Sequence, residues 1–282
     1  MPAVTVVLPA YDRAATLDGA VRSVLGQSFS DLELIVVDDG SSDSTEELIS
    51  RLMAEDRRIR YLKHPSNLGQ ASARNTGIRS ASGEFIAFQD SDDEWLGTKL
   101  ATQVAHLRGL PEAVGVVYCR MDSVGPEGRR PFPVPCFSPS DEDLYRKGLR
   151  YGFSGIGIQS CLFRRAVFEA CGVFDEELKA LEDMELLMRV AARYRFSCIG
   201  ETLVMYHKDP GGVARDHEKN LSAALRLLEK YRLDLSADRT ALAAHYRRIG
   251  TLMGKVGRRS EARKLKLRAW LLELGGRFAA PR

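Results

Sequence analysis

Apolar and polar positions follow two different rhythms over the first two hundred residues of the chain. Short apolar runs rich in β-branched residues predict strands, and longer stretches with apolar residues at helical spacing predict helices between them. The predicted strands are residues 4–8, 34–37, 59–62, 85–88 and 114–118, and the predicted helices are residues 16–27, 44–54, 70–80 and 99–107. Ser44 and Glu47 have the pattern of a capping box. The alternation is typical of an α/β fold with a mostly parallel central sheet, in which ligands bind beyond the carboxyl ends of the strands.

The rest of the chain changes its pattern twice. Proline and glycine are concentrated over residues 125–139, where they predict a loop between two halves. The second half predicts a strand near 160–163, a helix over about 181–193 and strands near 196–199 and 203–206. Beyond residue 216 the pattern predicts three helices, at roughly 217–232, 237–254 and 259–274, the last two as an antiparallel hairpin similar to one tetratricopeptide-type unit. The expected organisation is residues 1–124 and 125–215 as two halves of one domain, and 216–282 as a helical appendage.

Composition narrows the class of protein. The chain has 282 residues, 44% apolar and 28% charged, which excludes disordered and fibrous proteins. No apolar run approaches the ~20 residues of a membrane-spanning helix, and the start lacks a secretory pattern, so a cytoplasmic protein is expected. The five cysteines contain no C-x-x-C pair. We therefore expect reduced thiols without a catalytic role.

Charge is unevenly distributed along the chain. The overall net charge is +3, but residues 219–282 carry +11 and residues 1–218 carry −8. The basic helices are expected either to pack on the rest of the protein or to contact anionic lipid or an acidic partner, which would place the protein at the inner face of a membrane. Nucleic-acid binding is not expected, because the body is acidic and lacks an aromatic stacking platform.

Acidic residues follow two of the predicted strands. Asp38 and Asp39 come after the second strand, and Asp90, Asp92 and Asp93 come after the fourth. Asp38, together with the nearby aspartate at position 43, is interpreted as a turn or cap residue. Three aspartates within four residues repel one another unless a cation offsets the charge, and Mg²⁺ binds through few carboxylates plus substrate phosphates. The cluster therefore predicts a diphosphate substrate, and the absence of G-x-G-x-x-G and of a P-loop argues against NAD and nucleoside triphosphate sites.

Five motifs, in order, resemble those of inverting family 2 glycosyltransferases with the GT-A fold. They are VVLPAY at 6–11, VVDDGSSD at 36–43, NLG at 67–69 with ARNTG at 73–77, GEFIAFQDSDD at 83–93, and FDEEL at 174–178 with LEDMEL at 181–186. The resemblance spans about residues 3–207. It implies a GT-A type nucleotide-binding fold with residues 1–124 as the donor half and 125–215 as the acceptor half.

The resemblance also implies how a nucleotide-sugar donor would bind. Residues matching Pro9 and Tyr11 line the nucleoside pocket in similar enzymes. The acid matching Asp39 hydrogen-bonds the base, which favours a UDP- or dTDP-type donor because uracil and thymine carry an N–H donor. Arg74 would face the diphosphate or the donor sugar, with a charged residue on a helix surface as the ordinary alternative.

The resemblance also implies that a divalent metal ion, Mn²⁺ or Mg²⁺, binds with the donor. The family's D-x-D motif falls on Asp90-Ser91-Asp92. By this match Asp92 is the expected metal ligand and Asp93 a second candidate. Asp90 and Ser91 would contact the ribose or the donor sugar.

Asp183 is the candidate catalytic base. It lies near the start of a predicted helix and on its apolar face, where a buried carboxylate is costly. The resemblance implies that it deprotonates an acceptor hydroxyl as that oxygen displaces the nucleoside diphosphate with inversion. Glu182 and Glu185 are interpreted as structural, Glu185 through an i,i+4 pair with Arg189.

Two features of the acceptor side stay open. The glycine-rich segment 151–165 resembles the acceptor-facing part of the family but also fits an ordinary loop. Relatives often have a histidine a few residues past a tyrosine near the metal, whereas here His207 directly follows Tyr206 and Asp209 is near the usual position. Whether His207 or Asp209 approaches the metal is left open.

The leading hypothesis is a metal-dependent inverting glycosyltransferase that moves a sugar from a nucleoside diphosphate-sugar to a hydroxyl of a polysaccharide, lipid-linked glycan or protein acceptor. A sugar-phosphate nucleotidyltransferase would need a glycine-rich basic loop after the first strand, which residues 9–13 do not supply. A non-catalytic nucleotide-sugar or glycan-binding module is disfavoured because candidates for base recognition, metal binding and proton abstraction are all present.

Overall fold

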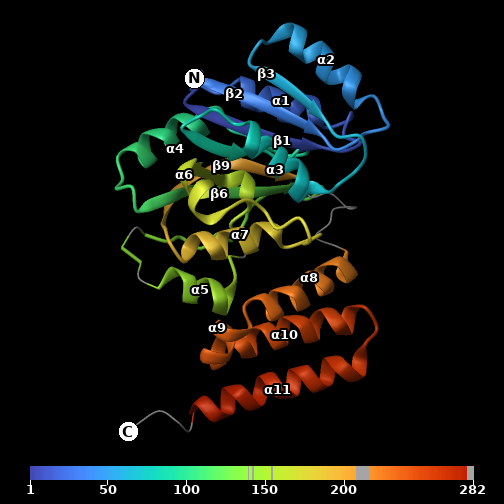
Figure 1. Cartoon of the computed structure of the whole chain (residues 1–282), viewed down its shortest axis with the longest axis vertical. Coiled ribbons are helices and arrows are strands. Elements are labelled where there is room, and N and C mark those ends of the chain that lie inside the picture. The colour runs from blue at the N-terminus through green and yellow to red at the C-terminus, as the bar shows by residue number, and fades with distance from the viewer. Residues whose placement is uncertain (139, 142, 154, 208–215, 278–282) are drawn as a thin grey trace.

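The N-terminal half is the parallel sheet that the sequence predicts. The computed structural model describes residues 1–138, 140–141, 143–153, 155–207 and 216–277 (Figure 1). Four parallel strands lie in the order β3-β2-β1-β4. They and their helices are β1 (Val4–Ala10), α1 (Leu17–Leu25), β2 (Leu32–Asp38), α2 (Thr45–Glu55), β3 (Ile59–Lys63), α3 (Gln70–Ser80) and β4 (Phe85–Phe88). β1 and β2 are buried along their whole length, as expected of parallel strands covered on both faces.

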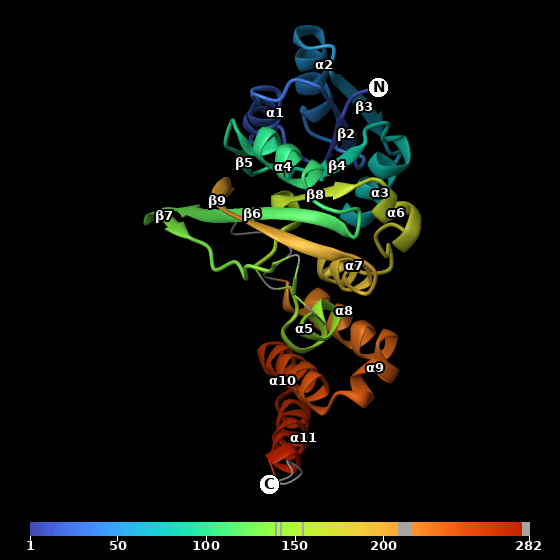
Figure 2. The ribbon, with the colours of Figure 1, turned by 90° about the vertical axis from the view of Figure 1, so that its left-hand side faces the viewer.

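The second half extends the same sheet with mostly antiparallel pairs. β8 joins β4 and β6 in antiparallel fashion, and β9 runs parallel to β6 (Figure 2). Over the described residues the strands form one nine-stranded sheet. The elements are β5 (Glu94–Trp95), α4 (Lys99–Arg108), β6 (Val114–Gly125), β7 (Gly128–Pro131), α5 (Leu144–Tyr151), a 3-10 turn (Ile158–Ser160), β8 (Cys161–Arg164), α6 (Ala166–Cys171), α7 (Glu182–Ala191) and β9 (Arg195–His207).

Several local expectations are wrong. The predicted loop at 125–139 begins as a hairpin of β6 and β7, because Gly128 adopts a φ of +89° that permits a tight turn. The two strands predicted at 196–199 and 203–206 are one strand, β9. Its polar middle forms an irregularity in the register with β6, and pairing continues on both sides of it. The capping box does not form, since Ser44 makes no side-chain cap. Instead, Asp43 Oδ1 accepts a hydrogen bond of 3.0 Å from the Thr45 amide.

Helix α3 lies unusually close to the sheet. A Cβ atom on Gly77 would be 2.2 Å from Val7 Cγ1 in β1, so only glycine allows this approach. The contact fixes the height of the helix above the strand ends. Arg74 and Asn75, on the preceding turn, are thereby placed at the edge of the sheet.

The first three of the four C-terminal helices pack on α5 and α7, and the last packs on the third. The four helices are α8 (His217–Lys230), α9 (Arg232–Ala237), α10 (Arg239–Lys255) and α11 (Arg259–Arg277), the last two as the predicted antiparallel hairpin (Figure 1). Leu227 and Leu235 belong to the same buried cluster as the apolar side of α7. Tyr231 donates a hydrogen bond of 3.0 Å to Glu185, which is fully buried on α7. The expectation that the basic helices pack on their own protein therefore holds for α8 to α10.

The expectation that all five cysteines are reduced thiols is wrong. Cys136 and Cys198 form a disulfide between the segment after β7 and the strand β9, whereas Cys119, Cys161 and Cys171 are free. The 62-residue separation of the two bonded cysteines left no signal in the sequence. Among the helices that the structure describes, none has the length and apolar character needed to cross a membrane.

Candidate active site

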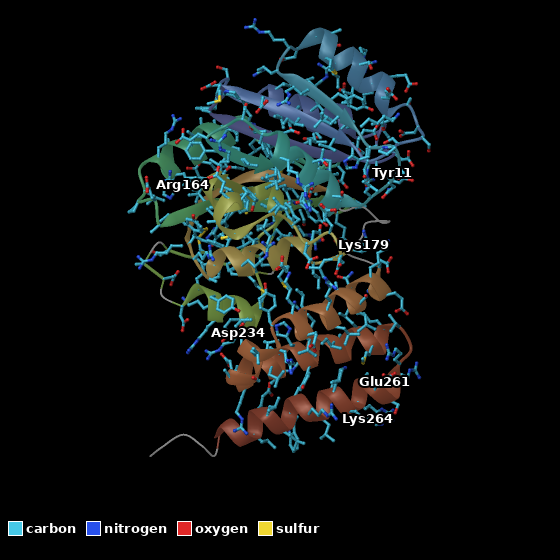
Figure 3. The ribbon with its side chains drawn as sticks, in the orientation of Figure 1. Tyr11, Arg164, Lys179, Asp234, Glu261 and Lys264 are labelled. Carbon is cyan, nitrogen blue, oxygen red and sulfur yellow. A yellow bond between two sulfur atoms is a disulfide. The ribbon has the colours of Figure 1, made fainter. Side chains whose placement is uncertain are left out.

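The carboxyl ends of three strands meet at one edge of the sheet. β1 lies between β2 and β4, with Pro9 paired to Val37 and Val7 to Phe88. The residues that follow these strands therefore converge. They line a cavity of about 760 Å³, the strand-end cavity, whose walls include Pro9, Tyr11, Asp39, Leu68, Ser91 and Lys179. Figure 3 shows Tyr11 and Lys179 at the same side of the molecule.

Asp39 organises the wall of the strand-end cavity. Its buried carboxylate accepts hydrogen bonds from His64 Nδ1 at 2.7 Å, the Leu68 amide at 3.0 Å and the Gly69 amide at 2.7 Å. A carboxylate has about four acceptor positions. Asp39 thus holds the turn before α3 in place and retains room for one further N–H donor from a ligand.

The other acidic residues near this cavity act within the protein. Asp38 accepts hydrogen bonds from the Ser41 amide at 2.7 Å and from the Tyr61 hydroxyl at 2.5 Å. Asp43 accepts one from the Ala14 amide at 3.1 Å. The interpretation of Asp38 and Asp43 as turn or cap residues is confirmed.

The D-x-D turn lies after β4, between the strand-end cavity and a second cavity. Ser91 lines the first cavity and Asp90 the second, and Asp92 is half-buried on the turn between them. Asp93 is fully buried, where its carboxylate accepts hydrogen bonds from the His207 amide and the Gln159 side chain, both at 2.8 Å. Burial, with Asp90 next in weight, raises the pKa of Asp93 to about 8. Asp93 therefore connects the D-x-D turn to the end of β9 through a buried hydrogen bond.

The donor set at this turn fits a divalent cation that a substrate helps to hold. No group of three or more His, Cys, Asp and Glu side chains forms a ready metal site among the described residues. Asp90 and Asp92 supply carboxylate oxygens, and His207 Nε2 is buried without a hydrogen-bond partner in the described part of the chain. Asp209 lies outside the described residues. Because Mg²⁺ commonly takes one or two carboxylates and completes its shell with phosphates and water, such a site fits a diphosphate ligand.

A second cavity adjoins the first. It has a volume of about 410 Å³ and is lined by Arg74, Asp90, Gly155, Gln159, Asp183 and Arg248, among others. We call it the helix-side cavity, because α3, α7 and α10 contribute to it. Gln70 and Glu182 line both cavities, so the two spaces share a wall.

Arg74 connects the residues of that shared wall. Its buried guanidinium donates to Glu182 Oε1 at 2.8 Å and to Asp90 Oδ1 at 2.9 Å, and it lies 5.4 Å from the centre of the Phe174 ring. The alternative of a surface helix charge is therefore wrong. Glu182, interpreted from sequence as structural, is part of the cavity wall as well.

Asn75 was missed as part of the site's support. Its side-chain amide donates to the Phe174 carbonyl at 3.0 Å and accepts from the Phe174 amide at 2.9 Å. This pair fixes the segment that leads into α7. The only sequence signal was its place in the ARNTG motif, which does not reveal a partner 99 residues away.

Asp183 is at the start of α7 and faces the helix-side cavity. Its Oδ1 accepts a short hydrogen bond of 2.6 Å from the Met184 amide. Burial, followed by the negative charge of Glu182, raises the pKa of Asp183 to about 6. It is thus an ionised carboxylate near neutral pH with a raised proton affinity, as a general base requires. Glu185, by contrast, is paired with Arg189 at 2.7 Å as predicted.

The helical appendage contributes residues that sequence reasoning did not find. Asn220 of α8 and Arg248 of α10 line the helix-side cavity, together with Gln159 and Tyr206. The segment 151–165 takes part as well, through Gly155 and its neighbours, which supports its interpretation as a ligand-facing segment. The pattern of residues 216–282 predicts helices but gives no sign of what they pack against.

Comparison with known proteins matches the fold and the motifs to one family. A sequence model described as Glycosyl transferase family 2 matches residues 5–172. The putative colanic acid biosynthesis glycosyl transferase WcaA of Escherichia coli K12 is 32% identical over 194 residues, which cover 68% of this chain and 67% of that protein.

Two further similarities concern a local match and the fold. The UDP-Glc:alpha-D-GlcNAc-diphosphoundecaprenol beta-1,3-glucosyltransferase WfgD of Escherichia coli is 42% identical over 102 residues, 36% of this chain and 40% of that protein. The matches to the first three curated relatives span between 33% and 42% of those proteins. The mannosyltransferase PcManGT of Pyrobaculum calidifontis, solved with GDP-Man and Mn²⁺, superposes with a TM-score of 0.64 at 21% identity and covers 99% of this chain and 80% of that one.

Proposed function

The chain belongs to glycosyl transferase family 2, and from this membership we propose that it transfers a sugar from a nucleoside diphosphate-sugar to an acceptor hydroxyl with inversion at the anomeric carbon. One observation carries the proposal. The strand-end cavity and the helix-side cavity share a wall made by Gln70 and Glu182, and the D-x-D turn lies at their junction. A nucleotide in the first cavity would therefore present its sugar to Asp183 in the second.

The donor we propose is of the UDP or dTDP type. Asp39 has one acceptor position free beside Pro9 and Tyr11, which suits the N–H of uracil or thymine. The name of the relative WfgD includes UDP-Glc, which supports this choice. Arg74 holds Asp90 and Glu182 at the junction, where the diphosphate and donor sugar would lie.

In the proposed reaction Asp183 accepts the proton of the acceptor hydroxyl. The acceptor oxygen attacks the anomeric carbon, and the bond from that carbon to the diphosphate oxygen breaks with its electron pair on the nucleoside diphosphate. Asp92, with Asp90 beside it, would hold Mn²⁺ or Mg²⁺, and the bound ion would stabilise negative charge on the diphosphate. Asp93 supports the turn from below through its hydrogen bonds with Gln159 and the His207 amide.

The acceptor we propose is a glycan of polysaccharide or lipid-linked glycan synthesis. WcaA is named for colanic acid biosynthesis, and the name of WfgD includes a diphosphoundecaprenol-linked sugar. The name of WfgD describes a sugar, GlcNAc, as the acceptor of the transferred residue. The helix-side cavity, with glycines in its wall, would hold such a sugar.

A nucleotide panel followed by a donor screen tests the proposal. Thermal unfolding is measured with UDP, dTDP, GDP and ADP, each with and without Mn²⁺, and release of free nucleoside diphosphate is then followed for the matching sugar donors. We expect UDP or dTDP to raise the unfolding temperature only when metal is present. Stabilisation by triphosphates alone would favour a nucleotidyltransferase, and nucleotide binding without any release of diphosphate would favour a binding module.

A further inference from the structure

Arg248 is a cation without a charged partner in the wall of the helix-side cavity. It projects from α10 and is half-buried, and its Nη1 lies 3.1 Å from Met184 Sδ. Among the described residues, no carboxylate lies within ion-pair distance of its guanidinium. The next residue, Arg247, is exposed and paired with Glu273 of α11.

Burial of an uncompensated guanidinium opposes folding. Proteins normally pair such a charge or leave it in water, because desolvation disfavours the ionised form. Desolvation indeed lowers the pKa of Arg248. The fold also makes room for the group, since Gly152 has a φ of +68° and a Cβ there would be 3.0 Å from Arg248 Nη2. The fold therefore holds the guanidinium of Arg248 in the cavity wall instead of directing it into bulk solvent.

We propose that Arg248 binds a phosphate or diphosphate group carried by the acceptor, next to the hydroxyl that Asp183 deprotonates. The inference rests on the proposed glycosyltransferase function and adds the chemical class of the acceptor. Asp90, Glu182 and Asp183 line other parts of the same cavity and would repel an anion there. Arg74, the other arginine in this wall, is already paired with Asp90 and Glu182, so Arg248 is the cation left for an anion, and its planar fork of N–H donors matches phosphate oxygens.

The position of the cation suits a sugar 1-phosphate unit. Met184, which contacts Arg248, directly follows Asp183 in α7. An acceptor sugar between the two groups would direct one hydroxyl to Asp183 and its anomeric phosphate to Arg248. Donor phosphates, by contrast, would lie at the D-x-D turn.

Calorimetric titration of the full chain saturated with UDP and Mn²⁺ tests this proposal. The probes are N-acetylglucosamine 1-phosphate, inorganic phosphate and neutral methyl N-acetylglucosaminide, against the wild type, Arg248→Gln, Arg248→Lys and the neighbouring control Arg247→Gln. Loss of a charged hydrogen-bonding partner in a desolvated site should weaken binding of the phosphate probes about 10- to 100-fold in Arg248→Gln. Arg248→Lys should recover part of that loss, and Arg247→Gln should resemble the wild type.

A stability measurement separates ligand binding from a structural role. Without ligand, Arg248→Gln should unfold at the same or a higher temperature than the wild type, because it removes an uncompensated charge. Equal affinity of wild type and Arg248→Gln for both phosphate probes, or failure of both probes to bind, overturns the phosphate site. If UDP with Mn²⁺ also fails to bind, the proposed transferase function fails as a separate result.

A different observation supports a second proposal, on helix α11. Leu267, Trp270 and Leu271 are 54–55% exposed and lie on the outer side of this helix, away from Ala262 and Ala269, which are buried against its neighbours. Arg263, Lys264 and Arg268 are exposed on the same or adjoining faces, and Lys264 points outward in Figure 3. The two acidic residues of the helix are already paired, Glu261 with Arg258 and Glu273 with Arg247.

We infer that this outer face of α11, defined by Leu267, Trp270, Leu271, Lys264 and Arg268, binds an anionic lipid bilayer. Exposed leucine and tryptophan side chains next to an excess of cations are typical of a helix that lies in the membrane interface. A basic surface is attracted to anionic headgroups, and each cation near such a surface contributes about 1 kcal/mol. The binding face belongs to the appendage that also carries Arg248 into the cavity.

Vesicle sedimentation tests the bilayer as the occupant. We compare phosphatidylcholine vesicles with and without phosphatidylglycerol, and follow the emission of Trp270, since the other tryptophan, Trp95, is buried. Binding should require phosphatidylglycerol and shift the emission to the blue. Lys264→Glu with Arg268→Glu should reduce binding about tenfold or more, and Trp270→Ser should weaken it, whereas Leu233→Ser on α9, also highly exposed, should not.

Two outcomes overturn the bilayer proposal. Binding that does not depend on phosphatidylglycerol or on these residues would remove the charge argument. A concentration-dependent dimer that Trp270→Ser dissociates, without vesicle binding by the wild type, would show that the face meets a second copy of the chain.

Discussion

The two adjoining cavities are built from different parts of the chain and satisfy their charges differently. In the strand-end cavity, Asp39 accepts three hydrogen bonds from the protein, two of them from backbone amides. In the helix-side cavity, Asp183 accepts a backbone hydrogen bond within its own helix, and the contact of Arg248 in the described part of the chain is with the sulfur atom of Met184. The first cavity is lined mostly by the segments that follow β1, β2 and β4 and by the start of α3, whereas the second brings α3 and the D-x-D turn together with α7 and α10.

We expect this difference to separate the residues that recognise the nucleotide from those that carry out the reaction. A carboxylate that is already hydrogen-bonded has a fixed position and can direct one remaining acceptor to a ligand, which suits recognition of a base. Burial of a carboxylate destabilises its ionised form and so raises its pKa. The ionised group then has a higher affinity for a proton, which suits a base catalyst. We therefore expect substitutions on the two sides to have different signatures in binding, rate and stability.

The largest expected effect comes from Asp183→Asn. Removal of a general base should lower the rate of transfer about 1000-fold, while binding of UDP with Mn²⁺ in the strand-end cavity stays unchanged. Because burial raises the pKa of Asp183, removal of its charge should also raise the free energy of unfolding at neutral pH by about 3 kcal/mol. Turnover assays, nucleotide titration and urea unfolding measure the three quantities.

The control for this variant is Asp31→Asn, at an exposed position before β2. It makes the same chemical change far from both cavities and should alter neither rate nor stability noticeably. Near-normal turnover of Asp183→Asn would show that another group takes the proton. A large loss of nucleotide binding would show that the two cavities are not separable in function.

Arg74 should give the next largest effect, because it joins the two cavities. Arg74→Met leaves Asp90 and Glu182 without their shared cation, and breaking a buried ion pair costs about 3–5 kcal/mol of stability. Arg79→Met on the same helix is the matched control. Its guanidinium is 60% exposed and pairs with Glu176 at 3.4 Å, so its loss should change stability by less than about 1 kcal/mol. Equal urea midpoints for the two variants would contradict the ion-pair geometry.

The same contrast explains what the sequence predicted and what it did not. The strand-end side depends on local features: apolar runs end in carboxylates, and parallel strands bring those ends together. Asp39 and the D-x-D turn could therefore be placed from the sequence alone. The link from Arg74 to Glu182 spans 108 residues and the contact of Arg248 with Met184 spans 64, and no local pattern encodes such distances.

Errors in the fold have a similar origin. The strand β9 was divided in two because Gly200 and Glu201 are exposed and polar in its middle, and only pairing with β6 shows that the strand continues. The Cys136–Cys198 disulfide likewise depends on the path of the segment after β7. Periodicity reports the face of an element, whereas these features depend on its neighbours.

A substitution at Gly77 should have a smaller effect, which acts through the position of α3 on the sheet. A Cβ atom there meets Val7 Cγ1 at 2.2 Å, and overpacking of this kind costs about 1–3 kcal/mol. Gly77→Ala should also displace α3 and with it Arg74, so nucleotide binding should weaken. The control is Gly254→Ala in α10, where a Cβ meets nothing within 4 Å and the added helix propensity should stabilise by about 0.5–1 kcal/mol. A neutral Gly77→Ala would show that α3 lies farther from β1.

The pH dependence gives the smallest effect and the finest test of the comparison. Asp183 acts as the proposed base only when ionised, and its pKa is raised to about 6, so the rate should fall about fivefold between pH 6 and pH 5. The free energy of unfolding changes in the opposite direction to the rate. The fold favours the neutral form of Asp183, so its ionised form lowers the stability of the wild type, and this loss disappears once the group is protonated in both the folded and the unfolded chain. The excess stability of Asp183→Asn over the wild type should therefore shrink as the pH falls from neutral toward 5. If the rate falls in that range while the difference in unfolding temperature stays constant, the titrating group is not Asp183, and the acidic limb belongs to the donor side of the site.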